Sequence, residues 1–374
     1  MDNPIPFSDE DWSRLERDWT AWWNHELDRP MLVAAGTVLA GRPAPAWWKG
    51  CGETGKLAHD IPAEAVAEEI WNDIRRIPLA GDAWPRFWIN FGPGIAAAFV
   101  GGDAHPTKDS MWFYPGIWKD KPLREIRPAY DADNRWWRRV RDLTRACAAV
   151  FDGCAQVGFT DIGGGLDIAA SLRETQPLLL DCMDDPDGVG ELCRLITPLW
   201  LRYYEELAAE IVPAGRGTSA WTPLWSPGRT CTMQCDFSYM IGPDQFAEWV
   251  VPDLAACCAR LDHGFYHLDG KGQIPHLDHL LDIPGLKGVQ WIPGDGQPHA
   301  ADPAWWPLLK RIRDAGKLVQ IYSPADAVLR MAREVPLTGI TIETWTPDRR
   351  NQAELVEAIQ RENAAVRSRE RPSI

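Results

Sequence analysis

One histidine and two carboxylates are spaced so that they could act together as metal ligands. His267 and Asp269 are two residues apart in a short apolar run, and Glu343 follows the apolar residues Ile340 and Ile342. Side chains alternate along a strand, so His267 and Asp269 point to the same face. A carboxylate in apolar surroundings is costly unless it is paired or bound to a metal. One imidazole with two carboxylates suits zinc or another divalent transition metal and favours oxygen-bearing substrates. We predict a metal site at His267, Asp269 and Glu343; a hydrogen-bonded rim histidine and a turn-forming aspartate are the alternatives.

Two further aspartates are candidates for moving protons or orienting a substrate. Asp161 and Asp236 follow apolar runs, where they could equally form turns or cap helices. Arg173 would hold an anionic group of the substrate or pair with a neighbouring acid. The complete set of substrate-binding candidates is Asn90, Arg173, Trp225, Gln290 and Tyr322.

These candidates stand mainly where short apolar runs give way to loops rich in glycine, proline and aspartate. Eight such runs lie at residues 86–91, 111–114, 156–162, 220–225, 264–268, 288–292, 318–322 and 339–344. Helical patterns follow several of them, at residues 185–211, 243–262, 303–315 and 350–367. Strands alternating with helices predict a parallel sheet covered on both faces. Eight runs favour a closed (β/α)8 TIM-type barrel, whose active sites lie at the C-terminal ends of the strands.

The N-terminal region predicts a helical extension of this α/β fold. Ser8 precedes three acidic residues, which is typical of a helix start, and apolar residues at helical spacing continue to about residue 25. A short strand at 31–35 and a loop rich in proline, glycine and tryptophan at 36–56 follow. We assign residues 1–80 to an extension packed on the barrel and residues 81–374 to the barrel itself.

Composition limits the classes of partner. The 374 residues carry a formal net charge of −14, which argues against nucleic acids and anionic membranes, since both need basic patches. No apolar run approaches the roughly 18 residues of a membrane span, and the N-terminus does not follow the pattern of a signal peptide, so a soluble cytoplasmic protein is expected. Nine cysteines without a CxxC pair argue against a disulfide framework. The 21 tryptophans are expected mostly in the core, with a minority lining a pocket.

The order of several motifs resembles that of the uroporphyrinogen decarboxylase superfamily. The matching stretches are residues 162–168 (IGGGLDI), 171–173 (SLR), 235–243 (CDFSYMIGP), 266–270 (YHLDG) and 290–294 (QWIPG). They span roughly residues 140–365. The resemblance implies a TIM-type barrel and an enzyme, closest to a decarboxylase-like branch rather than to the haem-pathway decarboxylase. That enzyme binds an acidic tetrapyrrole through arginines near its N-terminus, and residues 28–33 (DRPMLV) lack the corresponding signature.

The other activity that the resemblance implies is methyl transfer involving a corrinoid, with a zinc site that activates a thiol. Methyltransferases of this kind carry a His-x-Cys motif after a late strand and another cysteine near the last strand. Here His267-Leu268-Asp269 takes the place of the first motif, and Glu343 lies near the place of the second. Because carboxylates replace both soft ligands, we expect activation of a hydroxyl or an ether rather than a thiol. Cys235 is a spare soft ligand.

The first hypothesis is therefore a metal-dependent methyltransferase that demethylates a small methylated compound, with cobalamin on a corrinoid partner protein. A metal-free decarboxylase or lyase acting on a small acid, with Asp161 or Asp236 as the key carboxylate, is the second. A barrel that binds a ligand without catalysis is the third.

Overall fold

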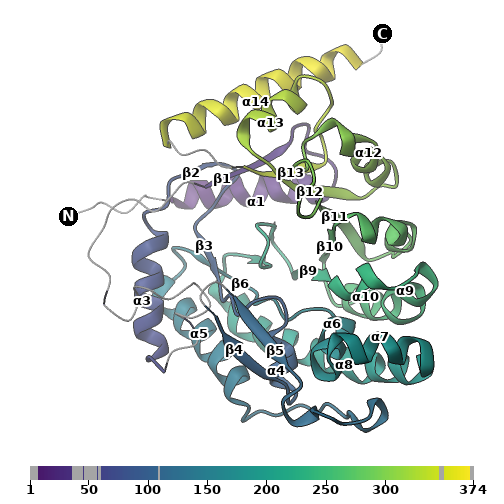
Figure 1. Cartoon of the computed structure of the whole chain (residues 1–374). Coiled ribbons are helices and arrows are strands. Elements are labelled where there is room, and N and C mark those ends of the chain that lie inside the picture. Colours follow the sequence, from purple (N-terminus) through teal and green to yellow (C-terminus); the bar gives the residue numbers. More distant parts are fainter. Residues whose placement is uncertain are drawn as a thin grey trace.

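The computed structural model describes residues 7–35, 45, 57, 60–107, 110–344 and 349–370. Its strands lie around the middle of the molecule and its helices lie outside them (Figure 1). The structure is thus a mixed α/β fold with parallel strands, as the alternation of apolar runs and helical patterns predicts.

The largest sheet has seven strands in the order β2-β1-β13-β12-β11-β10-β9. All neighbours in it are parallel except β2, which runs antiparallel to β1. Its strands are β1 (Met31–Ala35), β2 (Leu79–Gly81), β9 (Thr230–Gln234), β10 (His263–Asp269), β11 (Leu286–Ile292), β12 (Leu318–Tyr322) and β13 (Ile340–Thr344). Three two-stranded ladders accompany it: β3 (Arg86–Trp88) with β6 (Gln156–Gly158), β4 (Asp103–Pro106) with β5 (Met111–Tyr114), and β7 (Thr218–Ser219) with β8 (Trp225–Ser226).

Helices connect these strands and cover them. Those before β9 are α1 (Asp9–Trp23), α3 (Ala63–Ile74), α4 (Ile95–Phe99), α5 (Arg135–Phe151), α6 (Gly165–Arg173), α7 (Thr175–Asp184) and α8 (Pro186–Ile211). Those after it are α9 (Pro243–Trp249), α10 (Val251–Cys258), α11 (Leu277–Leu281), α12 (Trp306–Asp314), α13 (Ala325–Ala332) and α14 (Arg349–Glu370). The short 3-10 helix η5 (Asp236–Met240) follows β9 directly. Within the described part of the chain, no helix combines the length and the apolar character that crossing a membrane demands.

Strand register places polar side chains in one row across the sheet. The pairs Gln234–His267, His267–Gln290, Gln290–Gln320 and Gln320–Thr341 are register partners on neighbouring strands. The glutamines and Thr341 are buried. Buried polar groups need hydrogen-bond partners, and side-chain hydrogen bonds join His267 to Gln290 and Gln290 to Gln320, which links β10, β11 and β12.

Helix α1 packs a cluster of tryptophans against the N-terminal end of the strands. Ser8 caps the helix through a capping box with Asp11. Trp22 and Trp23 contact the ring of Phe265 near the start of β10, and the Trp23 ring stacks on His263 with centroids 4.3 Å apart. Each tryptophan buries a large apolar area. Helix α1 therefore covers the end of the strands opposite to their C-terminal ends, and we call it the α1 plug.

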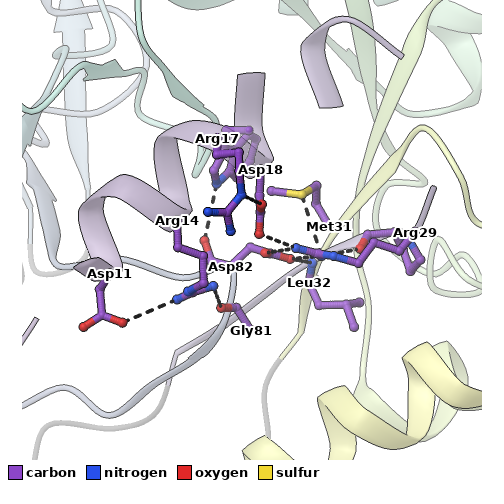
Figure 2. Close-up of polar contacts among 11 residues, drawn as sticks. Asp11, Arg14, Arg17, Asp18, Arg29, Met31, Leu32, Gly81 and Asp82 are labelled. Atoms are coloured by element: carbon purple, nitrogen blue, oxygen red, sulfur yellow. Dashed lines mark hydrogen bonds and ion pairs between the residues drawn. The ribbon is translucent and has the colours of Figure 1, made fainter. Parts of the chain in front are cut away.

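A salt-bridge network attaches the plug to the sheet (Figure 2). Arg29 donates two hydrogen bonds to the Asp82 carboxylate, both at 2.7 Å, and pairs with Asp18 of α1 at 3.0 Å. Asp82 also accepts the backbone N–H of Leu32 in β1 at 2.8 Å. The Arg29 guanidinium is thus engaged in structural pairing.

Several expectations about the strands need correction. Residues 111–114 form β5, which pairs antiparallel with β4 and is not a strand of the parallel sheet. The predicted run at 220–225 is mostly the loop of the β7–β8 hairpin. The sheet instead contains residues 230–234, whose polar composition (TCTMQ) does not read as an apolar run. Among the described residues, the ladders do not join all strands into one closed ring.

The N-terminal region contributes to the sheet itself. The strand predicted at 31–35 is β1, and it pairs in parallel with β13 from the other end of the chain. The loop predicted at 36–56 lies almost wholly outside the described residues. The domain boundary at residue 80 stays a prediction.

Candidate functional site

Three side chains meet at the C-terminal ends of β9 and β10. Asp236 is the first residue of η5, and His267 and Asp269 are in β10, two positions apart on one face. One ligand atom from each lies within 4.8 Å of the others. His267 Nε2 is 3.9 Å from Asp269 Oδ2. This group, which we call the His267 cluster, offers one imidazole nitrogen and two carboxylates to a cation.

The orientation of the imidazole is set by two buried glutamines. His267 Nδ1 is hydrogen-bonded to Gln290 Oε1, and Gln290 Nε2 donates to Gln320 Oε1 at 3.0 Å. Because the Gln290 oxygen can only accept, Nδ1 carries the proton and Nε2 presents its lone pair. The ring of Trp221 packs edge-on against the imidazole, with centroids 5.1 Å apart. His267 thus presents Nε2 on the side of Asp269.

Asp236 is positioned by a second carboxylate. Both oxygens of Asp167, in α6, accept backbone N–H groups of η5, from Asp236 at 3.0 Å and from Phe237 at 2.8 Å. Burial and the nearby Asp236 charge raise the pKa of Asp167 to about 7, although those N–H groups lower it. Desolvation by the surrounding protein raises the pKa of Asp236, His267 lowers it and Asp269 raises it. The Asp236 side chain still reaches solvent.

Asp161 lies just beyond β6 and is buried. Its carboxylate accepts the N–H of Gly163 at 2.9 Å. Burial is the main cause that raises its pKa to about 8, and the charges of Asp236 and Asp167 add to it, against the Gly163 hydrogen bond. An acid with this pKa is protonated at neutral pH and can donate a proton.

Glu343 belongs to a different group of side chains. It is not among the residues whose ligand atoms meet at the His267 cluster, within the described ranges. It interacts instead with Tyr322 and Arg86: burial raises its pKa, and the Arg86 charge and a hydrogen bond from Tyr322 lower it. The proposed trio of His267, Asp269 and Glu343 is therefore not assembled as such. β13 is three strands away from β10, whereas η5 follows the neighbouring strand β9.

The remaining substrate-binding candidates divide between the site and other places. Gln290 contacts His267, and Tyr322 interacts with Gln290 and Glu343. Arg173 is paired with Asp181, with Nε at 2.6 Å from Oδ2. Asn90 accepts the N–H of Gly92 in its own turn, at 2.9 Å.

Trp225 lies at the opposite end of the strands. Its backbone oxygen accepts the indole N–H of Trp23 in the α1 plug at 2.8 Å. The next residue, Ser226, is hydrogen-bonded to His263, the first residue of β10. His267 and Asp269 are at the other end of that strand, so Trp225 does not lie at the C-terminal ends of the strands with the His267 cluster.

The spare soft ligand is not brought into the cluster either. Cys235 is buried, and burial raises the pKa of its thiol well above its usual range. It is not a member of the His267 cluster.

Sequence reasoning missed three residues that shape the site. Asp167 lies within the 162–168 stretch, and an acid two residues into a helix after three glycines indicates contacts with backbone N–H groups of a loop. Arg86 begins a predicted strand, and a charge there signals a buried partner or a ligand. Nothing in the sequence indicates that Trp221 packs on His267.

A groove of about 580 Å³ lies beside the His267 cluster. Asp236 and Asp167 line it, together with Phe113 of the β4–β5 hairpin and Met240 of η5. Three large apolar side chains that line it are exposed to solvent, namely Trp112, Tyr114 and Met240.

Similarity to known proteins is found among solved structures. No family model matches the chain, and no curated protein matches it. Among solved structures, a methyltransferase from Methanosarcina mazei is similar with a TM-score of 0.56 and 13% sequence identity, over 94% of this chain and 99% of that chain. The similarity extends over nearly the whole of both chains, so the two proteins share a fold.

Proposed function

We propose that this protein is a metal-dependent methyltransferase that removes a methyl group from a small methylated compound in the cytoplasm. The main support for this proposal is the His267 cluster, in which a histidine hydrogen-bonded to Gln290 presents Nε2 beside two carboxylates. The fold shared with a methyltransferase supports the reaction class. We further infer that the ladders belong to one (β/α)8 barrel of the uroporphyrinogen decarboxylase type.

The residues present fit a divalent transition metal. His267 supplies nitrogen, and Asp236 and Asp269 supply oxygen, a donor set that zinc, manganese and iron accept. When bound, such a metal acts as a Lewis acid on an oxygen of the substrate. Asp236 thus takes the place that the sequence pattern assigned to Glu343.

The chain's own residues would perform the remaining tasks. Gln290 holds His267 in one tautomer, and Asp167 holds Asp236 through the backbone of η5. Asp161, protonated at neutral pH, is the donor for the oxygen that is left when the methyl group departs.

A corrinoid protein is the proposed acceptor of the methyl group. Exposed apolar side chains that line the groove support docking of a protein there: Trp112 is 63% exposed and Tyr114 is 49% exposed. Contiguous apolar surface of this kind is typical of interaction sites.

The metal content of purified protein tests the proposal. Wild-type protein is expected to contain close to one transition-metal ion per chain by elemental analysis, and H267A none. H279A is the matched control, because His279 is on α11 outside the cluster. Wild-type protein should then form methylcobalamin from cob(I)alamin and a methyl donor, followed by visible absorption. Wild-type protein without metal, or H267A with full metal, would refute the proposed site.

A second candidate function is a metal-free lyase acting on a small acid. The observation that favours it is the buried Asp161, whose raised pKa makes it a proton donor for a carbon centre after loss of carbon dioxide. Decarboxylation of a small acid that persists in chelator-treated protein and disappears in D161N would support this alternative.

A further inference from the structure

Arg86 lies among the strands near Glu343 but forms no direct ion pair with a carboxylate of the described residues, and its buried Nε has no hydrogen-bond partner there. It begins β3, and its guanidinium lies 5.6 Å from the ring centroid of Trp84. Nη2 donates to the backbone oxygens of Ala220 at 2.5 Å and Trp221 at 3.1 Å. No ion pair with a carboxylate is found for it within the described ranges of the chain. The guanidinium is thus anchored at one edge, while the rest of its hydrogen-bonding fork is not engaged by protein carboxylates.

This arrangement differs from that of Arg29. Arg29 is also partly buried, but two carboxylates neutralise it, Asp82 and Asp18. For Arg86, burial lowers the pKa to about 10, although the charges of Glu343 and Tyr322 raise it. A charge held in protein without direct neutralisation is costly. An anionic ligand is the kind of partner that removes this cost.

A chain of contacts connects Arg86 to the His267 cluster. Arg86 binds the backbone of Trp221, and the Trp221 ring packs on His267. On the other side, Arg86 interacts with Glu343, Glu343 with Tyr322, and Tyr322 with Gln290, which holds His267. Both routes lead from Arg86 to the same imidazole, so packed side chains connect the two groups on two sides.

We propose that Arg86 binds a carboxylate of the substrate, whose methyl-bearing atom lies toward the His267 cluster. The substrate class is a small methylated carboxylic acid, such as a methoxy acid. This inference rests on the proposed function for the position of the methyl group, but the binding of a carboxylate does not depend on it.

The chemistry of the site favours a carboxylate over a phosphate. The planar guanidinium matches a carboxylate with two parallel hydrogen bonds. Glu343 already places one negative charge near Arg86, which opposes a dianion more strongly than a monoanion. The half-buried rings of Trp88 and Trp221, with centroids 6.3 Å apart, offer apolar contact to the body of a flat acid.

Binding to chelator-treated protein tests this inference without the metal. The probes are 4-methoxybenzoate and its neutral counterpart 4-methoxybenzamide, with methoxyacetate and methoxyacetamide as a smaller pair, measured by calorimetry and by the shift in melting temperature. At least one acid is expected to bind and raise the melting temperature, while its amide binds at least tenfold more weakly. R86M should weaken the acid by about 10- to 100-fold, as expected for loss of a charge-assisted hydrogen bond.

Two further variants make the result independent of folding defects. R86K keeps the charge and loses the fork, so it should retain the fold and bind the acid more weakly than wild type. R311M is the matched control, because Arg311 is an exposed arginine of α12, and it should bind the acid as wild type does.

Several outcomes would overturn the inference. They are equal binding of acid and amide, unchanged acid binding by R86M and R86K, or no effect of any acid on the wild type up to 50 mM, a concentration of about ten times a weak millimolar Kd. Inorganic phosphate that stabilises the protein as much as the acids would assign a general anion site instead. Because the protein is free of metal in these experiments, failure here leaves the metal analysis of the His267 cluster unaffected.

Discussion

The side-chain oxygen of Gln290 accepts the Nδ1 proton of His267, and the amide of Gln290 donates to Gln320. The direction of the second hydrogen bond determines that of the first, because an amide has one acceptor end and one donor end. The only tautomer that satisfies both contacts leaves Nε2 free on the side of Asp269. A metal-binding histidine commonly has such a partner on its other nitrogen.

Replacing Gln290 with leucine should weaken metal binding by about 10- to 100-fold, the usual cost of removing the partner of a ligating histidine. The affinity is measured by competition with a chromophoric chelator. Q297L is the control, because Gln297 lies in the loop after β11 and not in the row. An unchanged affinity in Q290L would show that the hydrogen bond does not position the ligand.

Asp161 should make stability depend on pH. Its folded pKa of about 8 is above the usual value of 3.8, so the folded protein binds the extra proton between these pH values. This group therefore lowers the free energy of unfolding as the pH rises from about 4 to 8, by at most about 1.4 kcal/mol per pH unit. D161N should show a shallower decline than wild type in denaturant titrations of metal-free protein at several pH values. Parallel curves for the two proteins would contradict the assignment.

Removing Arg29 should destabilise the protein, because Asp82 would keep a buried charge without its partner (Figure 2). R29M is expected to lose about 3 kcal/mol in the free energy of unfolding by urea titration. Arg17 pairs with Asp18 on the surface, with 68% of its side chain exposed. The control R17M should therefore lose no more than about 1 kcal/mol, and equal losses in the two variants would argue against a special role of the Arg29–Asp82 pair.

The position of Trp225 at the end of the strands covered by α1 can be tested by substitution. Because it packs at the end of the strands that α1 covers, W225F should lower the melting temperature and leave metal content and ligand binding unchanged. A residue beside the His267 cluster would show the opposite pattern, with altered metal or ligand binding at an unchanged melting temperature. Thermal unfolding and calorimetry on the same preparation separate these results.

Local sequence patterns predict those helices and strands whose determinants lie within a few residues of one another. The helix start at Ser8, the strands at 264–268, 288–292 and 318–322, and the common face of His267 and Asp269 follow from capping, apolar runs and alternation. The strand at 230–234 does not follow from the sequence, because its alternate residues Thr230, Thr232 and Gln234 are polar. They are buried only in the fold, where they hydrogen-bond to His263, Thr222 and Pro93.

The third member of the His267 cluster follows from strand order, which is a property of the folded chain. Alternation along the strand predicts that His267 and Asp269 share a face, and the positions of the apolar runs predict acids near several strand ends. The sequence by itself does not determine which acid reaches them, because that depends on strand order. β9 lies next to β10, and Asp167 holds the turn after β9, so Asp236 arrives at the cluster. Glu343, three strands away, is hydrogen-bonded to Tyr322 instead and lies within the electrostatic influence of Arg86, and both lower the pKa that burial raises.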